Sequence, residues 1–103
     1  MQQFRQGDVL LEKIEKMPDG ERKEIKRENG ECVLAYGEAT GHHHAIKSRN
    51  ASLCFVAGDM YLLAGGEVDL THEEHGTIHI GPGDYRVVRQ MTYTPEEIKR
   101  VSD

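Results

Sequence analysis

Short apolar segments alternate along the chain with breaks that contain Gly, Asn or Asp. Segments of roughly four to nine residues with β-branched and aromatic side chains are typical of strands, and such breaks are typical of turns. The pattern predicts strands at residues 7–14, 23–27, 31–38 and 42–47, two strands within 53–66, and further strands at 67–72, 76–80 and 85–93. The chain is therefore expected to be all-β over most of its length.

Two details of this pattern predict local geometry. Asn29-Gly30 is a strong signal for a two-residue hairpin turn, because both residues tolerate positive φ. In the strand that follows, Tyr36 alternates with apolar neighbours on both sides, which predicts a strand buried on both faces with Tyr36 on one of them.

The length of 103 residues fits a single domain spanning residues 1–103. About seven to nine short strands in one small domain must close into a β-barrel or fold as a sandwich, because both arrangements hide strand edges. Thr94 as N-cap, Pro95 at the first helical position and Glu97 three residues after the cap predict a short C-terminal helix over residues 95–101.

The charge balance and the apolar runs exclude two classes of partner. With 13 basic and 18 acidic side chains, the net charge of −5 opposes the phosphate neutralisation that nucleic-acid binding needs. No apolar segment is long enough for a membrane span and no signal peptide is apparent, so a cytoplasmic location is expected. Cys32 and Cys54 lie in apolar runs without a CxxC companion, which predicts free, buried thiols.

All six histidines fall in two short windows, GHHHAI at 41–46 and LTHEEHGTIHI at 70–80. In a strand, His42 and His44 share one face while His43 points the other way. If Glu73-Glu74 forms a hairpin tip, the HEEH motif can direct His72 and His75 to one side. Two imidazole pairs suit a divalent transition metal such as zinc, iron, nickel or manganese.

We therefore predict a metal site formed by His42, His44, His72 and His75, with Glu38, Glu73 and Glu74 as candidates for a carboxylate ligand or for orienting the ligands. His43 and His79 alternate away from their neighbours and are left out. The alternative is a non-catalytic binding module whose histidines line a polar pocket or an interface. The sequence shows no set of general acid, nucleophile and oxyanion donor, so whether the protein is an enzyme stays open.

Several motifs resemble those of a small uncharacterised family of bacterial and phage proteins. They are QGDVLL near the start, GEATGHxH at 37–44, LxHEEH at 70–75 and PGxYxVxxQxxY at 82–93. The resemblance implies that the four proposed ligands belong to shared motifs, whereas His43 and His79 do not. It implies no activity.

A looser resemblance is to cupins, small β-barrels that hold a metal with an HxH pair, a nearby Glu and a later His. Ser48 and Arg49 stand where that Glu would fall, and Val87 and Val88 follow the PGDY turn where the later His would fall. The resemblance therefore extends to the fold alone. The few aromatic residues and the apolar segment MYLLAGG suggest that a partner completes part of the core, so a homodimer is expected. A small-molecule ligand is the partner expected if the histidines line a polar pocket.

Overall fold

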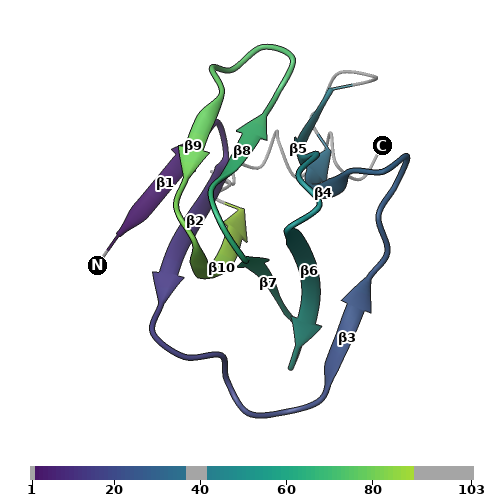
Figure 1. The fold of residues 1–103 in the computed structure, drawn as a ribbon, viewed down its shortest axis with the longest axis vertical. Helices are drawn as coiled ribbons and strands as arrows, with labels where there is room; N and C mark the ends of the chain where they lie inside the picture. The colour runs from purple at the N-terminus through teal and green to yellow at the C-terminus, as the bar shows by residue number, and fades with distance from the viewer. Residues whose placement is uncertain (1, 37–41, 90–103) are drawn as a thin grey trace, which may run out of the picture.

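The computed structural model describes residues 2–36 and 42–89, which contain ten strands (Figure 1). They are β1 (Gln3–Gln6), β2 (Val9–Ile14), β3 (Arg22–Ile25), β4 (Cys32–Tyr36), β5 (His43–Ile46), β6 (Ala51–Val56), β7 (Asp59–Ala64), β8 (Val68–Thr71), β9 (Ile78–Ile80) and β10 (Gly83–Arg89). The all-β prediction is confirmed. The predicted helix at 95–101 lies outside the described residues.

The strands form two antiparallel sheets rather than a closed barrel within the described part of the chain. One sheet has the order β1-β2-β10-β7-β6-β3, and the other has the order β4-β5-β8-β9. Alternating side chains from both sheets form one core in a sandwich-like arrangement, with Leu11, Leu62 and Tyr85 from the larger sheet and Ile46 and Leu70 from the smaller one all buried. The described residues contain ten strands, whereas seven to nine were expected for the chain.

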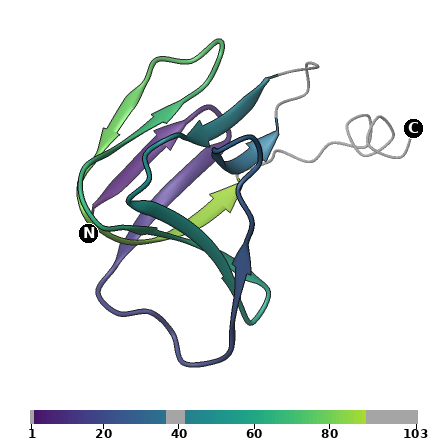
Figure 2. The same ribbon diagram turned by 45° about the vertical axis from the view of Figure 1, so that its right-hand side comes forward.

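The additional strand is β1, which the hydrophobic pattern did not indicate because its sequence QFRQ is mostly polar. β1 pairs with β2 in register Gln6↔Val9, so Gly7 and Asp8 form a two-residue turn. Gly7 has φ +59°, as the first central residue of a type II′ hairpin requires. Figures 1 and 2 both show β1 beside β9, so this turn lies near the end of the smaller sheet.

The prediction that Tyr36 lies on a buried face is wrong. The pairing of β4 with β5 shifts between Val33 and Ala35, which is the signature of a β-bulge. The bulge breaks the strict alternation, so Leu34 and Ala35 are both buried while Tyr36 is 56% exposed. A pattern of period two cannot register such an insertion.

Other local predictions are confirmed. Glu28 pairs with Glu31 around Asn29 and Gly30, whose φ values of 53° and 79° are those of a tight hairpin turn. Cys32 and Cys54 are free and buried. Within residues 2–36 and 42–89, the structure contains no helix long and apolar enough to cross a membrane.

Candidate functional site

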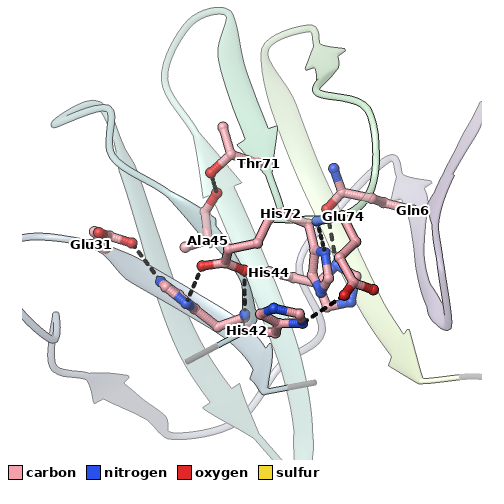
Figure 3. Close-up of polar contacts among 10 residues, drawn as sticks. Gln6, Glu31, His42, His44, Ala45, Thr71, His72 and Glu74 are labelled. Carbon is pink, nitrogen blue, oxygen red and sulfur yellow. Dashed lines mark hydrogen bonds and ion pairs between the residues drawn. The ribbon is translucent and has the colours of Figure 1, made fainter. Parts of the chain in front are cut away.

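The two histidine motifs come together at one end of the smaller sheet (Figure 3). β5 and β8 pair in the register Ala45↔Thr71, and continuing this antiparallel register places His44 opposite His72. The ring centroid of His72 lies 5.7 Å from that of His42, 4.4 Å from that of His44 and 4.6 Å from that of His75. His72 therefore contacts the other three predicted ligands. We call these four residues the histidine cluster.

The spacing within the histidine cluster can be compared with that of a metal site. Two imidazoles on one tetrahedral Zn²⁺ have centroids about 5 Å apart, since each Zn–N bond is about 2.0–2.1 Å. His44, His72 and His75 form a triangle with sides of 4.4, 4.6 and 5.9 Å, which brackets that separation. In the described residues, however, no three His, Cys, Asp or Glu side chains are arranged to hold a metal ion as they stand. Metal binding would require the rings to turn.

His44 is the buried member of the histidine cluster, with 1% of its surface exposed, and Gln6 determines its tautomer. The Gln6 amide nitrogen donates to the Leu70 carbonyl at 2.9 Å and to the Gly76 carbonyl at 2.8 Å. Both carbonyls can only accept, so the Gln6 Oε1 atom must face His44, where it lies 2.9 Å from Nδ1. The Nδ1 atom of His44 therefore carries a proton, and in the neutral ring Nε2 carries the lone pair.

The β1–β2 turn covers the same part of the histidine cluster. Asp8 Oδ1 lies 3.3 Å from His44 Nε2. A Cβ atom on Gly7 would lie only 2.7 Å from His75 Nε2 and 3.3 Å from His44 Cε1, so the turn approaches these rings with bare backbone. Burial is the largest cause of the lowered pKa of His44. The neighbouring rings of His72 and His75 lower this pKa further, whereas the Asp8 carboxylate raises it. The neutral ring is thus favoured.

The HEEH loop reaches the histidine cluster through Glu74. The Glu74 backbone N–H donates to His72 Nδ1 at 3.0 Å, and its carboxylate lies 3.4 Å from His42 Nδ1. Glu73 instead faces His43. The His43 backbone N–H donates to the Glu73 carboxylate at 2.8 Å, and this bond is the largest cause that lowers the pKa of Glu73. Glu73 thus ties the loop to β5.

The two histidines that the prediction left out have carboxylate partners of their own. The ring of His43 lies 2.9 Å from Glu31 through Nε2 and 3.1 Å from Glu73 through Nδ1. His79 is exposed and pairs with Asp69 on the neighbouring strand β8. The remaining predicted residue, Glu38, lies outside the described residues.

Three residues of this site were missed by the sequence analysis, namely Gln6, Gly7 and Asp8. Their signal in the sequence is the polar triplet QGD directly before the apolar run VLL. That triplet identifies a possible turn, but nothing in the local pattern indicates which part of the molecule the turn approaches.

The chain was compared with protein families, curated proteins and solved structures. A family model described as "Domain of unknown function (DUF8820)" matches residues 5–90, which include the β1–β2 turn and both histidine motifs. This agrees with the resemblance to an uncharacterised family. No curated protein and no solved structure matches the chain, so the resemblance to cupins stays a prediction.

Proposed function

Because the chain belongs to the DUF8820 family, whose function is unknown, we propose a function from its own residues. We propose that it binds one divalent transition metal, such as zinc, iron, nickel or manganese, through the histidine cluster. The observation that carries this proposal is that the ring of His72 contacts three other imidazoles, and that the four rings come from two separate motifs.

The hydrogen bond between Gln6 and His44 supports the proposal. A histidine that binds a metal usually donates its other ring N–H to an oxygen acceptor, which orients the ring and makes the ligating nitrogen more basic. His44 donates through Nδ1 to Gln6 and presents Nε2 toward the space shared with Asp8, where the metal would bind. His44, His72 and His75 form the compact part of the site, and a three-histidine set leaves a position for a further ligand.

A second candidate function is a metal-free binding module, and one observation favours it. Glu74 already occupies a ring nitrogen of His72 and faces one of His42, so these rings are held without a metal. In the metal-binding function, the bond from the Glu74 N–H to His72 must break, because ligation through Nε2 places the ring proton on Nδ1 and ligation through Nδ1 uses its lone pair. The two functions therefore differ in a measurable quantity, the metal content of the purified protein.

The experiment is metal analysis of untagged protein after supplementation with each metal and removal of the unbound ion. We expect about one equivalent in the wild-type protein and a loss of metal in His72→Ala, which removes the ring at the centre of the histidine cluster. His79→Ala is the matched control, since that ring is exposed and pairs with Asp69 outside the cluster. Less than about a tenth of an equivalent in the wild type would overturn the proposal, because such sites normally bind tightly.

We also propose a cytoplasmic location and a homodimer. Two buried free thiols fit a reducing compartment. β3 stands at one edge of the larger sheet and β9 at one edge of the smaller sheet, and an unpaired edge strand can pair with a second copy. The net charge of −5 supports the exclusion of nucleic acid as a partner.

A further inference from the structure

Asp8 places a carboxylate beside the ring of His44, and each of its oxygens has a different neighbour. Oδ1 lies 3.3 Å from His44 Nε2, and Oδ2 lies 3.3 Å from Arg89 Nη2 at the end of β10. Arg89 therefore holds one oxygen on the outer side and leaves the other directed at the histidine cluster. The Asp8 side chain is 41% exposed, whereas that of His44 is 2% exposed, so Asp8 stands between solvent and the buried ring.

The tautomer of His44 makes this contact chemically incomplete. Since Nδ1 donates its proton to Gln6, Nε2 of the neutral ring presents a lone pair. The facing Asp8 Oδ1 is also an electron-pair donor, and two such atoms repel each other unless a proton or a metal ion lies between them. Nitrogen and oxygen lone pairs that converge at this distance are the donor set of a metal ion.

We infer that Asp8 Oδ1 is a ligand of the same metal as His44, His72 and His75, which makes the site a set of three imidazoles and one carboxylate. This inference rests on the proposed function. It differs from the four-histidine prediction in assigning the fourth position to the β1–β2 turn, and it leaves His42 outside the ligand set.

The placement of His42 and of Gly7 favours this assignment. The ring of His42 contacts that of His72, and its Nδ1 faces the Glu74 carboxylate, so His42 stands at the HEEH side of the cluster. Gly7 lies against His75 and His44, where its missing side chain lets the turn approach both rings. Asp8 follows Gly7 directly, so the close approach brings its carboxylate to the His44 corner of the three-histidine triangle. A mixed nitrogen and oxygen set accepts iron, manganese and nickel as well as zinc.

The test is a titration of the untagged, metal-free protein with Co²⁺, followed by its visible absorption, in the wild type and in Asp8→Asn. Asn keeps the size of the side chain and removes its charge. We expect Asp8→Asn to weaken binding by about tenfold or more and to shift the Co²⁺ bands. Asp69→Asn is the matched control, because Asp69 also pairs with a histidine but lies outside the cluster, and it should bind as the wild type does.

Two further variants keep the outcome decisive. Asp8→Glu retains the carboxylate and should bind more tightly than Asp8→Asn, even if both turns are less stable than that of the wild type. His42→Ala should weaken binding less than Asp8→Asn does. An unchanged affinity and spectrum in Asp8→Asn, together with a loss in His42→Ala, would overturn the inference and leave a four-histidine site. No Co²⁺ binding by the wild type would instead overturn the proposed function.

Discussion

Replacing Gln6 by Ala should destabilise the protein strongly, because this one buried side chain satisfies three groups. Gln6 is 2% exposed and binds the Leu70 carbonyl, the Gly76 carbonyl and the His44 Nδ1 atom. The bonds to Leu70 and to His44 are buried, and the bond to Gly76 is partly buried. Ala would leave all of these groups without this partner.

The magnitude follows from the cost of an unsatisfied buried group, which is about 1–3 kcal/mol. Two fully buried groups give a loss of about 3 kcal/mol in the free energy of unfolding, a large fraction of the roughly 5–15 kcal/mol expected for a domain of this size. In urea, where small domains have m-values of about 1–3 kcal/mol per molar, the midpoint should fall by about 1–3 M.

The assay is urea unfolding of the metal-free protein, with Gln3→Ala as the matched control. Gln3 lies on the same strand but is exposed and bonds only the Glu12 side chain, at 3.3 Å, so its loss should change the free energy by less than about 0.5 kcal/mol. Gln6→Glu tests the donor role alone, since a carboxylate can accept from His44 but cannot donate to the two carbonyls. Equal midpoints for Gln6→Ala and Gln3→Ala would refute the role assigned to Gln6.

Two further predictions concern the turn and the protonation of the cluster. Gly7→Ala should lower the free energy of unfolding more than Gly30→Ala does. Both substitutions place Ala at positive φ, which costs about 1 kcal/mol, but only the Cβ atom at Gly7 would lie against His75 and His44. Equal urea midpoints for the two variants would contradict this prediction. In the metal-free protein, burial lowers the folded-state pKa of His44 below its ordinary value of 6.5, so the unfolded chain takes up the proton first as the pH falls. The free energy of unfolding should therefore keep its full value above about pH 6.5 and decrease as the pH drops through the folded-state pKa of His44. The decrease is at most about 1.4 kcal/mol per pH unit for one proton. A thermal midpoint that stays constant from about pH 8 to pH 5 would contradict it.

The sequence predicts the features that depend on neighbours along the chain. Alternation places His42 and His44 on one face of a strand, and the structure brings their rings to His72. The turn at Asn29-Gly30 was predicted because its two residues determine the local conformation. Each of these features depends on a period of two or on a single pair of residues.

The features that the sequence did not predict depend on insertions and on distant contacts. The bulge in β4 adds one residue to a strand whose composition stays apolar, so Tyr36 leaves the buried face without any change in pattern. Gln6 lies 64 residues before Leu70 and 70 before Gly76 in the chain, and no local rule relates such positions. β1 has few apolar residues and becomes a strand because β2 supplies its hydrogen-bond partners.

The burial of Gln6 and His44 is itself an argument for function. Both are nearly inaccessible, and the described chain has no other buried polar or charged residue. The Leu70 and Gly76 carbonyls account for the burial of the Gln6 amide nitrogen, but neither of them requires that its Oε1 atom meet a histidine. What the polar pair adds is orientation, because Gln6 holds the ring of His44 in one tautomer with Nε2 facing Asp8. The proposed metal site needs that orientation, because a ligating ring nitrogen must present its lone pair to the ion.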